Sequence, residues 1–305
     1  MVKARNPLLV LIWSLGLYLL VHTTQYVGCF AASAISGASF ESIISGKFSN
    51  HLTQLGQGVT AGVVGIPFLF FVARFLWRRP WSWVRLHVNV KFLSYGLLFG
   101  IGVAALSLLT VGLFGNVRVV ASPDRFKEAE LASVVLGTLG WVAFIAVLEE
   151  FIFRGIAVRE WATRWGWPVA TLLGGIYFGC IHVIGLLPNI SIIEVLWIVV
   201  AAITANMLFV ALYVRSKSLW LPIGFHAGWN LSLETLFGVT MSGQDSPYAL
   251  YSIEISGRDS VTGGVFGIEG SVVVMVIWII ISLVVLRYSR SGKPDLMNSG
   301  LGETT

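Results

Sequence analysis

Long apolar stretches recur along the chain, and each is close to the length that an α-helix needs to cross the hydrocarbon layer of a membrane. Shorter polar connections separate these stretches, and nearly all of the Lys and Arg residues lie in them or at the ends of the stretches. The pattern predicts an all-α integral membrane protein, a bundle of about eight transmembrane helices. We place these helices near residues 7–28, 55–77, 92–114, 131–158, 168–187, 192–214, 219–238 and 270–288.

The positively charged residues are divided unevenly between the two sets of loops that eight spans create. Fourteen of the 20 Lys and Arg residues lie on the side of the two termini, five lie on the other side, and Arg154 lies inside a span. Because cytoplasmic loops carry an excess of Lys and Arg, we predict a multi-pass protein of the cell membrane with both termini in the cytoplasm. The first apolar run, from Pro7, is interpreted as a retained helix and not as a cleaved signal peptide.

Composition supports a lipid environment and excludes other classes of protein. The 305 residues are 56% hydrophobic and 11% charged, whereas soluble domains contain about 25% charged residues. The net charge of +5 is explained by the cytoplasmic loops. We find no basic patch interleaved with aromatic residues, so the lipid bilayer is an expected partner and nucleic acid is not.

The chain divides into three regions by the placement of its spans and loops. Residues 1–130 hold the first three predicted helices, and residues 131–238 hold the next four. Residues 239–305 comprise a long non-cytoplasmic loop, the last helix and a tail from Gly292. The glycine-rich part of this loop, residues 263–270, is interpreted as a turn that leads the chain into the last helix.

The fourth predicted span carries Glu149, Glu150 and Arg154 inside an otherwise apolar run. An ionised carboxylate at the centre of a bilayer is unfavourable by about 2.5–3.5 kcal/mol, so two adjacent ones require an explanation. Glu150 and Arg154 are four residues apart and share a helix face, and we expect them to form an ion pair. Glu149 points about 100° away from Glu150, which leaves it to face a different neighbour.

Polar residues on two later spans lie at a similar depth. His182 follows Phe178 by four residues on the fifth span, and His226 precedes Asn230 by four residues on the seventh. At the rise of an α-helix, Glu149, His182, His226 and Asn230 all lie roughly 14–22 Å from the predicted cytoplasmic edge. We therefore predict that these four side chains share a polar cavity in the middle of the membrane.

This set of side chains suits the hydrolysis of a carbonyl compound, and a peptide bond is the expected target. A carboxylate can act as general base on water, and an imidazole or amide can stabilise the developing oxyanion. A glutamate and two histidines are also the ligands of a catalytic zinc site with an open position. The HExxH and GxSxG signatures are absent. A metal-free mechanism and a divalent metal, zinc, bound by Glu149, His182 and His226 both remain open.

Three motifs resemble those of the CAAX-processing and bacteriocin-processing intramembrane proteases, known as the CPBP or Abi family. They are Glu149-Glu150-x-x-x-Arg154, Phe178-x-x-x-His182 and His226-x-x-x-Asn230. The resemblance covers residues 131–237, and the stretch from Gly264 to Gly270 looks like one that precedes the last helix in bacterial members. It implies a bundle of eight helices with its active site inside a cavity.

The resemblance also implies roles for the motif residues. Glu149 is expected to be the general base, with His182 and His226 orienting the water or binding a metal. Asn230 is expected in the oxyanion site, and Glu150 with Arg154 is expected to hold the geometry. The implied substrate is a membrane-associated peptide or protein, such as a prenylated C-terminal tail or a peptide precursor.

Two other functions are compatible with charged residues inside a membrane. One is a transporter or channel, because such residues also mark ion and proton paths. The other is a protein that keeps the fold without the activity, such as a bacteriocin self-immunity factor. Glu234 lies near the outer end of a span and is interpreted as an interfacial group, and His22 lies near a membrane edge and is interpreted as a solvated packing residue.

Overall fold

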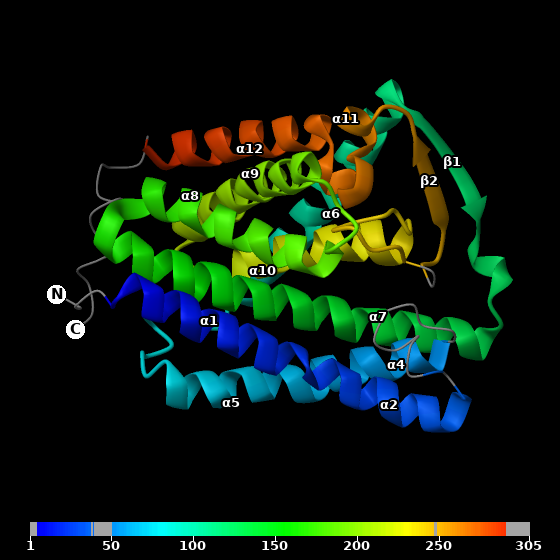
Figure 1. Ribbon diagram of the computed structural model, residues 1–305, viewed down its shortest axis with the longest axis horizontal. Helices are drawn as coiled ribbons and strands as arrows, with labels where there is room; N and C mark the ends of the chain where they lie inside the picture. Colours follow the sequence, from blue (N-terminus) through cyan, green and yellow to red (C-terminus); the bar gives the residue numbers. More distant parts are fainter. Residues whose placement is uncertain (1–4, 38, 40–50, 247–248, 291–305) are drawn as a thin grey trace.

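The computed structural model describes residues 5–37, 39, 51–246 and 249–290, which form a predominantly helical bundle (Figure 1). The tail predicted from Gly292 lies outside the described residues, and so do residues 40–50 between the first two predicted spans. The helical elements are α1 (Pro7–His22), α2 (Thr24–Ser36), α4 (His51–Val59), η1 (Thr60–Gly65), α5 (Ile66–Leu76), α6 (Val90–Phe114), η2 (Pro123–Arg125), α7 (Glu128–Glu149), η3 (Glu150–Val158), α8 (Arg159–Leu186), α9 (Ile192–Ser216), α10 (Trp220–Asn230), η4 (Leu231–Leu236), α11 (Asp259–Thr262), η5 (Gly264–Phe266), η6 (Ile268–Gly270) and α12 (Val272–Arg290). Two strands complete the structure, β1 (Asn116–Ala121) and β2 (Ser252–Ser256).

Each segment predicted to span the membrane is helical, and the all-α membrane fold is confirmed. Within the described ranges, five helices are long and apolar enough to cross a membrane. One of them, from Glu128 to Leu186, contains both the fourth and the fifth predicted spans. The chain breaks its helical geometry inside this stretch at Gly166, where φ is 77°. Glycine tolerates this left-handed conformation without the steric penalty that a side chain would add.

Contacts at the two ends of the bundle join loops that were predicted to share a side. At one end, Arg5 and Arg79 both pair with the Glu160 carboxylate, at 3.7 and 2.9 Å. At the other end, β1 and β2 pair in antiparallel register. This small sheet was not predicted from the sequence. The start of α1 and the end of α12 lie at the same end of the bundle, as an even number of passes requires (Figure 1).

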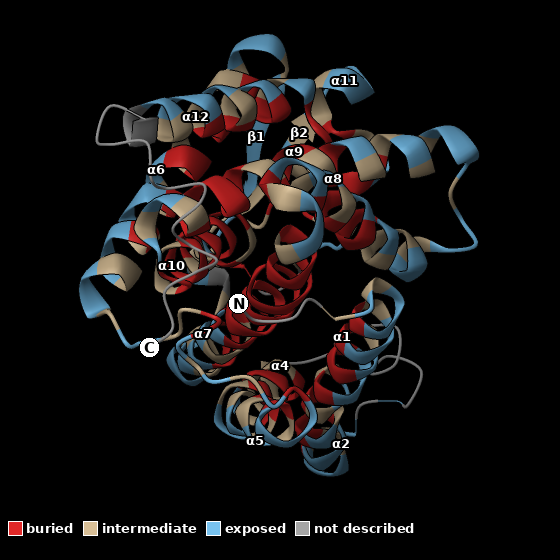
Figure 2. Cartoon of the chain, turned by 90° about the vertical axis from the view of Figure 1, so that its left-hand side faces the viewer, coloured by how far each residue is buried: buried red, intermediate tan, exposed pale blue. Residues whose placement is uncertain are grey.

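The continuous helix formed by α7 and η3 occupies the centre of the molecule (Figure 2). The group α1, α2, α4 and α5 lies on one side of it, and α6, α8, α9, α10 and α12 lie on the other. Every residue of η3, from Glu150 to Val158, is buried. The charged residues of this segment therefore face other helices and not lipid.

The central helix and α4 cross at small residues. A Cβ atom placed on Gly58 would overlap the carbonyl oxygen of Gly137, and one placed on Gly140 would overlap the carbonyl oxygen of Gly58. Small residues at helix crossings allow two backbones to approach closely, which is a main source of packing energy between membrane helices. The crossing sets α4 against the wall of the cavity described below.

We expect Gly58→Ala to destabilise the protein by about 1–3 kcal/mol, the usual effect of inserting a methyl group into a well-packed contact. The measurement is the melting temperature of the detergent-purified protein. Gly16→Ala is a matched control, because a Cβ at that position in α1 meets no atom within 4 Å. If the two variants melt at the same temperature, the close crossing does not stabilise the fold.

Candidate active site

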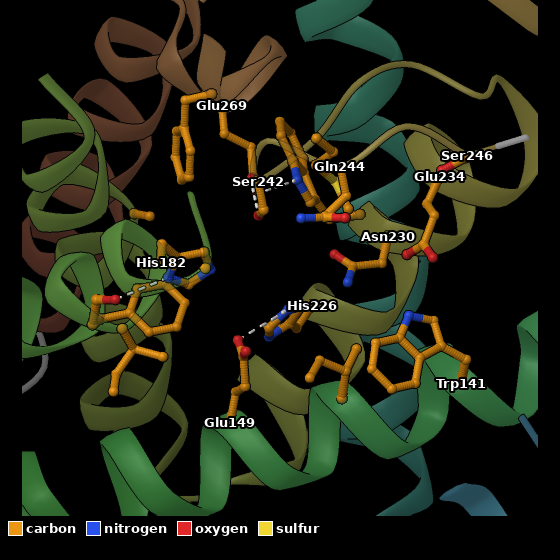
Figure 3. Close-up of a pocket in the computed structure, with 18 of the residues that line it drawn as sticks. Trp141, Glu149, His182, His226, Asn230, Glu234, Ser242, Gln244, Ser246 and Glu269 are labelled. Atoms are coloured by element: carbon orange, nitrogen blue, oxygen red, sulfur yellow. Dashed lines mark hydrogen bonds and ion pairs between the residues drawn. The ribbon is translucent and has the colours of Figure 1, made fainter. Parts of the chain in front are cut away.

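Four of the residues singled out in the sequence line one cavity of about 520 Å³ inside the bundle (Figure 3). Glu149 ends α7, His182 lies in α8, and His226 and Asn230 lie in α10. The three helices thus bring together a carboxylate, two imidazoles and an amide that are far apart in the sequence. The predicted polar cavity is present in the structure.

The two adjacent acids of the first motif face different surroundings. Glu149 lines the cavity, and its Oε1 atom lies 3.5 Å from the hydroxyl of Tyr18, which donates to it. Glu150 is fully buried and accepts a hydrogen bond from Nη1 of Arg154 at 2.8 Å. The predicted ion pair is therefore formed within one helix, four residues apart.

Arg154 is fully buried and joins three helices. Its Nε atom donates to Oδ1 of Asn206 on α9 at 3.0 Å, and Asn206 donates in turn to the carbonyl oxygen of Thr171 on α8 at 2.7 Å. The guanidinium carbon lies 4.6 Å from the ring centre of Phe178 and 4.3 Å from that of Phe209. A buried charge is tolerated only when it is paired in this way. Phe178, from the second motif, thus contacts a residue of the first.

His226 is held by the carboxylate that also binds the arginine. Its Nδ1 atom donates to Oε1 of Glu150 at 3.0 Å, and its Nε2 atom lies 3.9 Å from Oε2 of Glu149. We assign the proton to Nδ1 because Glu150 can only accept there. In its neutral form, His226 presents an Nε2 lone pair toward the Glu149 carboxylate, and a donor such as water would satisfy both acceptors. The sequence did not predict that Glu150 serves Arg154 and His226 together.

The remaining two polar groups are also arranged to contact a ligand. Nδ1 of His182 lies 2.9 Å from the carbonyl oxygen of Phe178 and donates to it, so Nε2 is the nitrogen left for a ligand. Asn230 is 6% exposed, and its Oδ1 atom has no hydrogen-bond partner among the described residues. Buried amides are normally paired, so an orphaned one inside a cavity points to a missing partner.

The predicted metal ligands Glu149, His182 and His226 stay a prediction, and their arrangement in the cavity is as follows. In the part of the chain that the structure describes, no three His, Cys, Asp or Glu side chains are grouped closely enough to hold a metal ion. Glu149, His182 and His226 therefore line the same cavity without forming a ligand set in this arrangement. Both histidines donate through Nδ1 and leave Nε2 available, which is also the pattern of metal-bound histidine.

Several residues of the site were not identified from the sequence. His22 and Glu234 line the cavity instead of the membrane edges predicted for them. His22 stacks on Tyr18 with ring centres 5.3 Å apart. Position along a helix gives depth but not the face that turns inward, which explains both misplacements. Asn206 carried a usable signal, because it is an amide inside an otherwise apolar span, like Asn230.

The loop between η4 and α12 closes one end of the cavity. The sequence had predicted only that the glycine-rich part of this loop forms a turn. Ser242, Gln244 and Glu269 from this loop line the cavity (Figure 3). Glu269 accepts hydrogen bonds from Nε1 of Trp229 at 3.1 Å and from the hydroxyl of Ser242. The predicted turn is also present, and Gly267 within it has a φ of 76°.

The helical bundle and the polar groups enclosed in it define an integral membrane protein with a cluster of polar side chains inside the helical domain. Residues 131–232, which carry all three motifs, match the family model described as type II CAAX prenyl endopeptidase Rce1-like. This match covers about a third of the chain and confirms the resemblance predicted from the three motifs. Comparisons with curated proteins and with solved structures found no match.

Proposed function

We propose that the protein is an intramembrane endopeptidase that hydrolyses a peptide bond in a membrane-associated polypeptide. The observation that carries this proposal is the convergence of Glu149, His182, His226 and Asn230 on one cavity inside the bundle. The description of the matched family favours a substrate with a prenylated C-terminal tail. A membrane-associated peptide precursor is the second substrate class to be tested.

The first half of the reaction follows from the tautomers in the site. A water molecule between Oε2 of Glu149 and Nε2 of His226 donates one hydrogen to each acceptor. Nε2 of His182 is a further acceptor in the cavity and is available to a donor group of the substrate. Glu149 takes a proton from the water as its oxygen bonds to the carbonyl carbon. The carbonyl oxygen becomes an oxyanion, which the amide N–H of Asn230 stabilises by hydrogen bonding.

In the second half, the carbon–nitrogen bond breaks. The proton held by Glu149 passes to the departing nitrogen, which leaves as an amine, and the carbonyl carbon is left in a carboxylic acid. Glu149 is thereby returned to its ionised form for the next cycle. Throughout, Glu150 keeps the proton of His226 on Nδ1, so that Nε2 remains an acceptor.

A metal-dependent form of the reaction would use the same three side chains. Glu149, His182 and His226 would have to draw together around a divalent cation, for which zinc is the expected element with this ligand set. Such an ion would activate water and polarise the carbonyl. The two forms differ in their response to chelation.

The orientation is part of the proposal. We place both termini in the cytoplasm of a cell-membrane protein, supported by the excess of Lys and Arg in the loops of that side. The ion pairs of Arg5 and Arg79 with Glu160 agree with this placement, because they join three of those segments. In this orientation the loop that closes the cavity lies on the non-cytoplasmic side.

The test is cleavage by the purified protein in proteoliposomes. Membrane-anchored peptides, with and without a prenylated C-terminal tail, are supplied, and products are identified by mass spectrometry. Cleavage that survives chelation, in protein found to contain no metal, supports the glutamate-based mechanism. Cleavage that chelation stops and zinc restores supports the metal-dependent one. If no peptide is cleaved and the proteoliposomes instead show proton or solute flux, the proposed function is wrong and the protein is a transporter.

A further inference from the structure

The end of the cavity beneath the loop is acidic, and the described residues that line it include no Lys or Arg. Glu234, Asp245 and Glu269 line this end, in addition to Glu149 deeper in the cavity. None of the described residues that line the cavity is Lys or Arg. Arg154 is fully buried behind Glu150 and does not line it. A ligand in this part of the cavity therefore meets a negative field.

The two glutamates at this end are held in place by neighbouring side chains. Hydrogen bonds from Trp229 and Ser242 fix the carboxylate of Glu269. Glu234 stands beside the indole of Trp141 (Figure 3). Glu234 and Glu269 line the same cavity, so two carboxylates face the same space. A cation bound within their reach would be attracted by both charges, and an anion would be repelled.

Buried oxygen atoms without a hydrogen-bond donor give independent evidence of the kind of ligand that the cavity binds. Oδ1 of Asn230, a residue that is 6% exposed, has no donor among the described residues, and neither has the buried Oε1 atom of Gln54. Both residues line the cavity. Burial of an acceptor without a hydrogen bond is unfavourable by about 1–3 kcal/mol. A ligand that carries several N–H groups would donate hydrogen bonds to these oxygens and remove that cost.

Aromatic rings complete the surroundings. Trp141, Trp229 and Trp278 line the cavity, and the rings of Trp229 and Trp278 lie 5.1 Å apart. The face of an indole attracts ammonium and guanidinium groups. Carboxylates, free carbonyl oxygens and indole rings together are complementary to an organic cation.

We propose that the loop end of the cavity is a subsite for a basic side chain, Lys or Arg, of the polypeptide substrate. The inference rests on the proposed function and adds a determinant of specificity to it. Glu234 follows Asn230 by four residues, in η4 directly after the end of α10, and both side chains line the cavity. Because Asn230 contacts the bond to be cut, the basic residue lies within a few residues of that bond. An acidic residue at the same place is disfavoured.

The experiment compares two substrates that differ only by Lys or Gln near the cleaved bond. Wild-type protein is expected to cleave the Lys substrate with the higher kcat/KM, by about 10- to 100-fold, the range for hydrogen bonding to a charged group. Glu234→Gln and Glu269→Gln should each lower this ratio severalfold. Glu234→Lys should shift the preference toward a substrate with Glu at that position. Glu128→Gln, an exposed carboxylate at the start of α7, is the control and should leave the ratio unchanged.

The outcomes separate this subsite from the proposed function. Equal losses for the Lys and Gln substrates in the glutamate variants would show that these residues act structurally, and would overturn the subsite. If wild-type protein cleaves the Lys and Gln substrates equally well, the subsite is also overturned, but the proposed endopeptidase function is supported. If no peptide is cleaved at all, the endopeptidase fails, and binding of labelled peptides to the Glu149→Gln protein tests the subsite. If basic and acidic peptides then bind the Glu149→Gln protein equally well, the subsite proposal is overturned.

Discussion

Glu149→Gln is expected to reduce kcat for a membrane-associated peptide by about 10²–10⁴-fold, the range for loss of a general base. Gln occupies the same space but cannot accept a proton from water at neutral pH. In the wild-type structure Glu149 accepts a long hydrogen bond from Tyr18 and lies close to His226. The melting temperature should therefore stay close to that of the wild type. The measurement is turnover in proteoliposomes, with thermal melting of the same preparation.

Two further variants test the assignment of this role. Tyr18→Phe removes the weak hydrogen bond at 3.5 Å and should change turnover only a few-fold, which makes it the matched control. His226→Ala removes a partner of the water and should lower turnover strongly. Wild-type turnover in both Glu149→Gln and His226→Ala would rule out the proposed chemistry.

Glu150→Gln is expected to have the largest effect on stability. Removal of one partner from a buried ion pair is unfavourable by about 3–5 kcal/mol, because the other charge is left uncompensated. Here that charge is Arg154, whose side chain has no exposure to solvent. The melting temperature of the detergent-purified protein should fall markedly. Turnover should fall as well, because the charged acceptor that fixes the tautomer of His226 is lost.

A double variant separates the two contributions of Glu150. Glu150→Gln combined with Arg154→Met removes both charges, and well-packed apolar residues often replace a buried pair without loss of stability. We expect this protein to recover much of its melting temperature while its turnover remains low. A single Glu150→Gln variant that melts like the wild type would show that the ion pair does not hold the fold.

The sequence predicted the parts of the fold that depend on local pattern. The apolar stretches gave the helices, because the length needed to cross a membrane is fixed by its thickness. Counting residues along each helix predicted a common depth for Glu149, His182 and His226, and in the structure all three residues line one cavity. The four-residue spacing of Glu150 and Arg154 gave their ion pair, since that spacing brings side chains together on any helix.

The parts that were missed depend on how helices rotate against one another. The bond between His226 and Glu150 joins α10 to η3, and neither depth nor spacing within one helix specifies such a contact. The same holds for Asn206, which reaches Arg154 from α9. The loop after η4 lacked any repeating pattern, so its position over the cavity could not be inferred. Its hydrophobic residue Ile268 is fully buried, which shows that tertiary packing determines its course.

The ion pair within η3 has a consequence for the way the protein enters the membrane. An isolated arginine near the middle of a span opposes insertion by about 2.5–3.5 kcal/mol. Arg154 carries its counter-ion on the same helix, four residues earlier, so the pair requires no side chain from α9 or α10. The charge of the arginine is thus balanced by a neighbour that enters the membrane with it. Asn206 and His226, which come later in the chain, add hydrogen bonds to this pair.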